Sequence, residues 1–129
     1  MGYTHYWNQK RDFTMEEWAK IIAMFQNEIQ PENRRCLGNW EGEGDPDCDG
    51  EYISFNGRGK DSHETFSLTR LKRDIFEYEN AQEFERDGAF SFCKTNRKPY
   101  DNAVVSLLIG VRQIVSDAIS LSSDGDDLD

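Results

Sequence analysis

The chain has 129 residues, of which 36% are hydrophobic and 12% aromatic, which suffices for one modest core and excludes a disordered polypeptide. No run reaches the roughly 18 to 20 apolar residues of a membrane-spanning helix, and the N-terminus lacks the features of a signal peptide. Cys36, Cys48 and Cys93 are odd in number and show no C-x-x-C spacing, as is typical of free thiols in a reducing compartment. We therefore expect a single cytoplasmic domain over residues 1–129 that makes no contact with a membrane.

The net charge of −10 is concentrated in two acidic segments, an insert at about residues 41–51 and a C-terminal tail at about residues 124–129. These segments hold ten carboxylates, and the remainder of the chain has 15 acidic and 15 basic residues. Local basic patches are therefore available to an anionic ligand. Direct binding of nucleic acid is not expected, because phosphate neutralisation needs many more cations on one face.

The first predicted elements are a strand and a helix. Residues 3–8 are predicted to form a strand, with Tyr3, His5 and Trp7 on one face and Thr4, Tyr6 and Asn8 on the other. Thr14 and Glu17 form a capping box, which marks the start of a helix. Apolar residues recur from Trp18 to Ile29 at steps of three and four, so one stripe of this helix is expected to lie on a sheet, and Pro31 is expected to end it.

The next segment predicts an irregular connection over residues 31–50 and then a hairpin. Strands at residues 51–55 and 64–68 are expected to pair across a loop that Asn56-Gly57 begins, because this dipeptide suits positive backbone dihedral angles. Before the hairpin, the sequence resembles the start of an EF-hand loop, with Asp45, Asp47 and Asp49 as candidate calcium ligands. The match then fails, since Asn56 stands where a bidentate Glu is required, and a solvated acidic turn is the alternative.

The C-terminal half predicts further strands around one long helix. For residues 70–88 we expect a loop, a short strand near residues 75–78, a helical turn over residues 81–86, and a turn at Asp87-Gly88 into a central strand at residues 89–93. Residues 104–111 are apolar on nearly every face and predict a buried helix, with Pro99 in its first turn. A last strand is expected at residues 118–122. These elements predict an α+β fold, a two-layer sandwich in which two helices pack on a mostly antiparallel sheet of five to six strands.

Several short motifs occur along the chain in the order Gly2-Tyr3-Thr4-His5-Tyr6-Trp7, Phe55-Asn56-Gly57, His63-Glu64-Thr65-Phe66, Phe92-Cys93-Lys94-Thr95, Lys98-Pro99-Tyr100-Asp101 and Ser123-Asp124-Gly125. In this order they resemble a group of small uncharacterised proteins encoded by bacteriophages and prophages. The resemblance spans nearly the whole chain and implies an intracellular, phage-related origin, but no particular activity. The acidic insert and the Asp-rich C-terminal end depart from the pattern of that group.

The same motifs fall at turns and at the ends of predicted strands, so their side chains are expected to converge at one edge of the sheet. They offer rings for stacking, amides for base edges, and cations beside a helix N-terminus for an anion, which favours a pocket for a nucleotide-like molecule. The alternative is that they only cap the sheet and tie it together. The candidate ligand-binding residues are His5, Tyr6, Trp7, Asn56, His63, Glu64, Lys94, Thr95, Arg97, Lys98, Tyr100 and Asp101.

Two other kinds of site can be assembled from these residues. Cys93, with His5 or His63 as base and Glu64 as the orienting group, would make a nucleophilic site, but Cys93 falls in an apolar strand, where thiols are usually inert. His5, His63 and Cys93 would make a zinc site, but their spacing matches no zinc pattern. We therefore expect neither a cofactor nor a bound metal.

The resulting expectation is a non-catalytic, phage-type binding protein that sequesters a small anionic, nucleotide-like ligand and so counters a host signal or defence. The alternative is an inhibitor directed at a host defence protein, whose acidic segments imitate nucleic-acid phosphates in the manner of anti-CRISPR proteins. A small enzyme that uses Cys93, His63 and Glu64 is the third hypothesis. The sequence does not decide between a monomer and a homo-oligomer.

Overall fold

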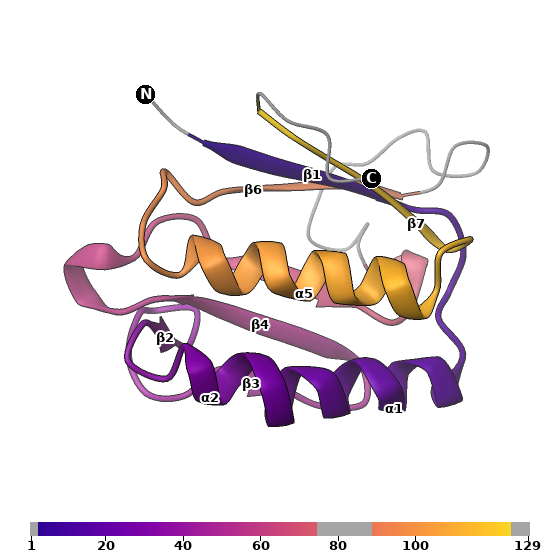
Figure 1. Ribbon diagram of the computed structural model, residues 1–129, viewed down its shortest axis with the longest axis horizontal. Coiled ribbons are helices and arrows are strands. Elements are labelled where there is room, and N and C mark those ends of the chain that lie inside the picture. The colour runs from indigo at the N-terminus through magenta and orange to yellow at the C-terminus, as the bar shows by residue number, and fades with distance from the viewer. Residues whose placement is uncertain (1–2, 75–88, 125–129) are drawn as a thin grey trace.

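The computed structural model describes residues 3–74 and 89–124, which form an α+β fold (Figure 1). The predicted fold class is confirmed, but the strands form antiparallel sheets of three and four strands instead of one sheet. The elements follow in the order β1 (Thr4–Gln9), α1 (Met15–Met24), η1 (Phe25–Ile29), α2 (Gln30–Glu32), β2 (Leu37–Gly38), β3 (Asp47–Cys48), β4 (Tyr52–Gly57), η2 (Gly59–Asp61), β5 (Phe66–Thr69), β6 (Ala89–Lys94), α5 (Asp101–Ile114) and β7 (Ile119–Ser123).

The first sheet has the order β6-β1-β7, and β1 is antiparallel to both neighbours. His5 of β1 pairs with Cys93 of β6 on one side and with Ser123 of β7 on the other. We predicted that β6 would be a central strand, but it lies at an edge of this sheet. The reason is topological: β6 and β7 are joined through α5, and β1 lies between them, which makes a split βαβ unit.

The second sheet is built on β4. The predicted hairpin is confirmed, since β5 lies antiparallel to β4 with Ile53 opposite Leu68, while the two-residue strands β2 and β3 pair with β4 as well. The predicted turn at Asn56-Gly57 is wrong, because both residues continue β4 and the positive φ falls at Gly59 (+53°). Gly57 is needed for a different reason: a Cβ there would collide with the backbone carbonyl of Asp61.

The first helix begins as predicted but ends later. Thr14 Oγ1 accepts the Glu17 N–H at 3.0 Å, and Glu17 Oε1 accepts the Thr14 N–H at 2.9 Å, so the capping box is formed. Pro31 does not end the helix. The chain widens into the π-helical turn η1, in which the Gln30 N–H donates to Phe25 O, and then continues to Glu32. A wide turn relieves the crowding that a proline ring imposes on the carbonyl four residues before it.

The long helix α5 begins at Asp101, so Pro99 lies in the preceding turn and not in the first helical turn as predicted. Its buried residues include Val104, Leu107 and Leu108, and it runs antiparallel to α1. The two helices approach closely at Gly110, where a Cβ would collide with the sulfur of Met24. None of the helices within the described ranges combines the length and the apolar character of a membrane span.

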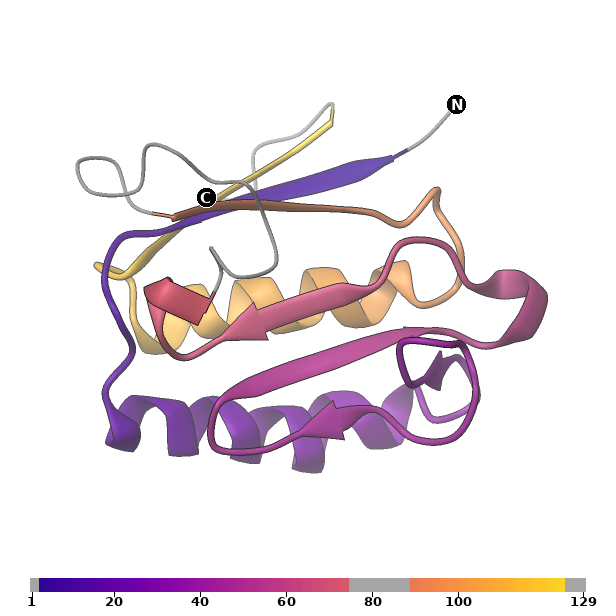
Figure 2. The same ribbon diagram turned by 180° about the vertical axis from the view of Figure 1, so that it is seen from behind.

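The elements are arranged so that both long helices lie on the same side of the β4–β5 pair. Figure 2 shows β4 and β5 in front of α5, with β1, β6 and β7 crossing along one side of that helix. One core fills the interior between them, and its large aromatic members include Trp7, Trp18, Phe25, Phe55 and Phe66. The strand, helical turn and Asp87-Gly88 turn predicted within residues 75–88, and most of the acidic tail, lie outside the described residues.

Candidate functional site

Many of the predicted site residues do meet at one place, where β1 and α5 begin and β6 and β7 end. We call this set the junction cluster; its members are His5, Glu64, Cys93, Thr95, Tyr100, Asp101 and Ser123. They come from β1, from the residue pair before β5, from β6 and the turn after it, from the start of α5, and from β7. The fold therefore brings these segments together at one end of β1.

His5 links three of these elements. Its side chain is fully buried, with Nδ1 2.6 Å from Ser123 Oγ and Nε2 2.6 Å from Asp101 Oδ1. A carboxylate only accepts hydrogen bonds, so Nε2 carries a proton, and in a neutral ring Nδ1 accepts from the serine. The Thr95 hydroxyl donates to the same Asp101 oxygen. Burial acts to raise the pKa of the Asp101 carboxyl, but the hydrogen bonds from His5 and Thr95 outweigh it, so this pKa lies below its ordinary value.

Ser123 was absent from the predicted site, although it pairs directly with His5 across β1 and β7. Serine, histidine and aspartate in one chain of hydrogen bonds invite comparison with serine hydrolases. In those enzymes Nε2 faces the serine and Nδ1 faces the aspartate, whereas both assignments are reversed here. Ser123 also lines neither of the two hollows described below. The visible role of this chain of contacts is to hold β1, β7 and α5 together.

A second network surrounds Cys93. The Tyr100 hydroxyl donates to the Glu64 backbone carbonyl at 2.6 Å, and the Cys93 thiol lies 3.4 Å from the same oxygen. The Glu64 carboxylate accepts the Lys94 backbone N–H at 3.0 Å. Burial, and then the charge of Glu64, raise the pKa of the Cys93 thiol to about 12. A thiol with this pKa stays protonated at neutral pH, so the geometry gives the nucleophile hypothesis no support.

Asn56 is fully engaged inside the protein. Its Oδ1 accepts the backbone N–H groups of Gly57 and His63, at 2.7 and 2.9 Å, and its Nδ2 donates to His63 O and Thr65 Oγ1, at 3.1 and 3.2 Å. The side chain thereby closes the loop between β4 and β5. The His63 side chain is exposed at this end of the molecule.

Tyr6 and Trp7 do not join the junction cluster. Trp7 faces the core, 2% exposed, with its ring centroid 5.1 Å from that of Phe66. Tyr6 points to the other face of β1, where its ring stacks on Phe90 at 6.0 Å and its hydroxyl donates to Asp124 Oδ1. Successive residues of a strand point to opposite faces, so His5 and Tyr6 cannot line one pocket from within it.

The predicted cations lie on the surface above the cluster. Lys94 and Arg97 are exposed, Lys98 is half-buried, and the Arg97 guanidinium lies 4.4 Å above the centroid of the Tyr3 ring. Asn96 and Arg97 both have positive φ, 53° and 57°, in a turn that the Lys98 N–H closes by donating to Thr95 O at 3.0 Å. Left-handed backbone is strained in a residue with a long side chain, and such strain often accompanies function.

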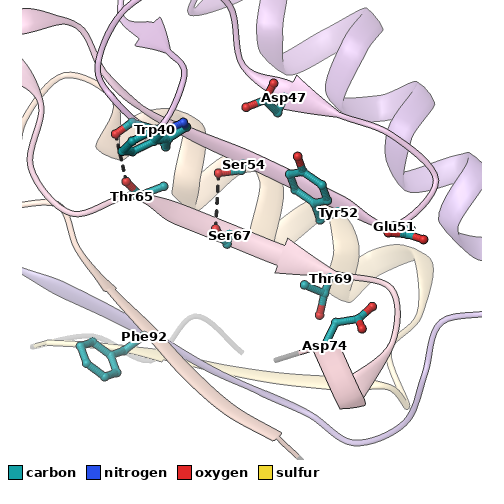
Figure 3. Close-up of a pocket in the computed structure, with 10 residues that line it drawn as sticks. All are labelled: Trp40, Asp47, Glu51, Tyr52, Ser54, Thr65, Ser67, Thr69, Asp74 and Phe92. Carbon is teal, nitrogen blue, oxygen red and sulfur yellow. Dashed lines mark hydrogen bonds between the residues drawn. The ribbon is translucent and has the colours of Figure 1, made fainter. Parts of the chain in front are cut away.

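A hollow lies elsewhere, on the face of β4 and β5 that the helices leave uncovered. We call it the acidic groove; it has a volume of about 600 Å³. Figure 3 shows Trp40 and Phe92 on opposite sides of β5, with hydroxyl groups along the strands between them. The lining residues are Trp40, Asp47, Glu51, Tyr52, Ser54, Thr65, Ser67, Thr69, Asp74 and Phe92.

Charge and exposure give the acidic groove a distinct chemistry. Asp47, Glu51 and Asp74 supply carboxylates, and no Lys, Arg or His is found among the described residues that line it. Trp40 is 61% and Phe92 41% exposed, which is unusual for such large rings. Sequence reasoning missed this groove, although polar Tyr52 and Ser54 alternate with apolar Ile53 and Phe55, so that the two pairs face opposite sides of β4.

The candidate metal sites are not assembled. Asp49 Oδ1 accepts the backbone N–H groups of Glu51 and Tyr52, at 2.8 and 3.0 Å, so it shapes a turn, while Asp47 lies in β3. Within residues 3–74 and 89–124, no group of three His, Cys, Asp or Glu side chains is placed to hold an ion. Neither Asp45 with Asp47 and Asp49, nor His5 with His63 and Cys93, therefore forms a ligand set.

Comparison of the chain with models of known protein families, with curated proteins and with solved structures found no match in any of the three.

Proposed function

We propose that this chain is a binding protein and that its acidic groove receives a basic segment of a partner protein. The observation that carries this proposal is the composition of the groove, in which three carboxylates and three aromatic rings surround hydroxyl groups without a cation among the described lining residues. An anionic ligand would be repelled there. Arginine or lysine side chains would meet both opposite charge and the faces of aromatic rings.

The position of Trp40 supports the same proposal. Tryptophan, tyrosine and arginine are the residues that most often dominate the energy of protein interfaces, and exposed tryptophan is rare elsewhere. Trp40 leads directly into the acidic insert, which contributes Asp47 and Glu51 to the groove. The carboxylates around the groove would steer a basic partner toward these rings and set the register of the complex.

In this proposal the chain is the protein-directed inhibitor that its acidic segments suggest, and the resemblance to phage proteins makes a host protein the expected target. A basic nucleic-acid-binding surface on that host protein would have the matching chemistry. The proposed activity is occupation of that surface and not a chemical reaction. Burial raises the pKa of Cys93 to about 12, so this thiol would not serve as a nucleophile.

Intrinsic fluorescence tests the proposal directly, because Trp40 is 61% exposed while Trp7 and Trp18 are each 2% exposed. An arginine-rich peptide should change the emission in a saturable way, and a glutamate-rich peptide of equal length should not. Neutralising the groove with Asp47→Asn and Glu51→Gln should weaken binding about tenfold or more.

The matched control is Glu43→Gln with Asp45→Asn, which removes the same charge from the acidic insert outside the groove lining. This control should bind the arginine-rich peptide nearly as well as the original chain. Equal weakening by both pairs would mean diffuse charge attraction, and no saturable change at all would refute the groove as a binding site.

A second candidate function keeps the small anionic, nucleotide-like ligand and places it at the turn of Lys94, Arg97 and Lys98. The observation that favours it is the left-handed backbone of Arg97, which holds the guanidinium over Tyr3 beside two further cations. Pyrophosphate and cyclic dinucleotides should then shift the NMR signals of residues 94–101. Lys94→Ala and Arg97→Ala should reduce those shifts, whereas Lys60→Ala, an exposed cation on η2, should not; unchanged shifts in all three variants would refute this candidate.

A further inference from the structure

A second hollow is lined by residues of the two long helices. These helices lie on one side of β4 and β5, and the acidic groove lies on the other side (Figures 1 and 2). We call this second hollow the helix groove; it has a volume of about 880 Å³ and lies between α1–η1–α2 and α5. Gly110 and Met24 both line it, and the absence of a side chain at Gly110 lets α5 approach Met24 closely. A broad, open depression between two helices suits the surface of another protein better than a small molecule.

The lining of the helix groove is less charged than the rest of the chain. Apolar side chains from both helices contribute to it, including Met24, Val105, Ile109 and Ile114, each of them only partly buried. Its charged residues are one lysine and two glutamates, in a chain whose net charge is −10. Partly exposed apolar groups with few charges around them are typical of the centre of an interface between protein subunits.

The three charges of the helix groove are separated along its length. Lys20 lies in α1, whereas Glu28 lies in η1 and Glu32 at the end of α2. At about 1.5 Å per helical residue, the carboxylates lie about 12 and 18 Å from the lysine along the axis. The helix groove therefore has a positive end and a negative end, with Met24 and Gly110 between them.

We propose that two copies of this chain pair through their helix grooves about a twofold axis that passes near Met24. A twofold axis brings the same surface of both copies together in opposite directions, so Lys20 of each copy meets Glu28 and Glu32 of the other. The apolar side chains on both sides of the axis are covered at the same time. A groove with opposite charges at its two ends is complementary to itself only in this antiparallel arrangement.

Pairing through the helix grooves would also affect how the acidic grooves bind a partner. The helix grooves are covered in the pair, while both acidic grooves stay accessible on the outer sides. A paired molecule would then hold two basic segments at once and bind a partner with repeated basic segments more tightly than a single copy does.

Charge reversal tests the pairing, with oligomeric state measured by sedimentation velocity over a range of protein concentrations. The original chain should be a dimer. Lys20→Glu should weaken the dimer about tenfold or more, because the groove of each copy then carries three carboxylates that repel the three of the other copy. Glu28→Lys with Glu32→Lys should also weaken it, because each groove then carries three cations. The three substitutions combined exchange the two ends of the groove and should restore the dimer.

All three side chains are exposed, so these variants should fold, and circular dichroism checks that they do. Lys60→Glu makes the same change of charge on η2, outside the helix groove, and should leave the dimer intact. A monomeric original chain, a dimer indifferent to Lys20→Glu, or a combined variant that stays monomeric would each overturn the proposal.

Discussion

His5 is the residue that joins three elements within the junction cluster. It has no exposed surface, yet both of its ring nitrogens make hydrogen bonds, one to β7 and one to α5. A buried polar group of this kind stabilises a fold only as long as all its partners remain, because each orphaned partner loses its hydration without compensation. Loss of the His5 side chain should therefore destabilise the contacts among β1, β7 and α5.

His5→Phe keeps a ring of similar size but removes both hydrogen bonds. We expect the free energy of unfolding to fall by about 2–4 kcal/mol, since Asp101 and Ser123 lose a partner in a poorly hydrated site. Urea unfolding followed by circular dichroism measures this change. His63→Phe is the matched control, because His63 is exposed, and it should change stability by no more than about 0.5 kcal/mol. Equal effects of the two substitutions would show that the His5 contacts do not matter for stability.

Cys93 should be the least reactive of the three cysteines. Its pKa of about 12 leaves roughly one thiol in 10,000 ionised at about pH 8, and its side chain is buried. In a Cys36→Ser, Cys48→Ser variant, an aromatic disulfide reagent should therefore find no reactive thiol until denaturant is added. Reaction with the folded variant at the rate of a free thiol would contradict this burial and reopen the nucleophile hypothesis.

At the scale of elements, the start of α1 is anchored by one acidic residue with two tasks. Glu17 completes the capping box, and its carboxylate also pairs with both Nη atoms of Arg11 at 2.9 Å. Arg11 in turn donates to Asp117, just after α5. The hydrogen bonds from Arg11, followed by the one from the Thr14 N–H, lower the pKa of Glu17 from 4.5 to about 2.

This depressed pKa predicts the response to acid. Between pH 4.5 and about 2 the unfolded state binds more protons than the folded state, so stability is present above this window and falls as the pH falls through it. Glu17→Gln keeps the cap but removes the charge. We expect a loss of about 0.2–1 kcal/mol at neutral pH and a weaker dependence on pH inside the window, measured by urea unfolding at each pH. Glu16→Gln, in the same helical turn, should give the same dependence of unfolding free energy on pH as the original chain. If Glu17→Gln gives it as well, the pairing of Glu17 with Arg11 contributes nothing to stability.

Elements defined by local patterns were predictable, and those that depend on distant partners were not. The capping box, the β4–β5 hairpin and the buried helix α5 each follow from a few neighbouring residues. The π-helical turn before Pro31 was not foreseen, because an isolated proline is typical of a helix end, and the contacts of this turn, such as Phe25 on Phe55, are made with distant segments. The division into two sheets was missed for a similar reason, since it depends on β1 lying between β6 and β7.

At the scale of the whole molecule, a net charge of −10 works against compactness. Much of it lies on exposed carboxylates of the acidic insert, which repel one another over about 10 Å at moderate salt. We therefore expect the urea midpoint to rise as the ionic strength rises from about 0.01 to about 1 M. Neutralising Glu41, Glu43 and Asp45 together should raise the urea midpoint at low salt and make the midpoint depend less on ionic strength.

Arg35→Gln provides the opposite change, since it removes an exposed cation and should make the salt dependence steeper. A midpoint that falls with salt in the original chain would mean that specific ion pairs outweigh the general repulsion, contrary to this expectation.

The candidate sites, like the sheets, could be predicted only where they depend on neighbouring residues. The junction cluster was foreseeable because its motifs fall at strand ends. The sequence could not tell that His5, Asn56 and Tyr100 would each use their polar groups in hydrogen bonds to other parts of the protein. The acidic groove was not foreseeable as a unit. Trp40, Tyr52 and Phe92 come from three separate segments, and on each segment an outward ring or hydroxyl looks like an ordinary solvent-facing residue.

The central position of β1 has a consequence for how the protein is made. Its described partners are β6 and β7, and His5 contacts Ser123 across 118 residues of chain. On the ribosome, α1 and the β4–β5 hairpin can assemble as they emerge, but β1 must wait until β6, α5 and β7 have left the exit tunnel. Contacts between such distant segments form slowly, and the wait leaves Trp7 and two unpaired strand edges open to wrong partners. Strand β1, which is synthesised before both of its described partners, is thus among the last of these elements to be sheltered, and it is the segment of the nascent chain that we expect a chaperone to hold.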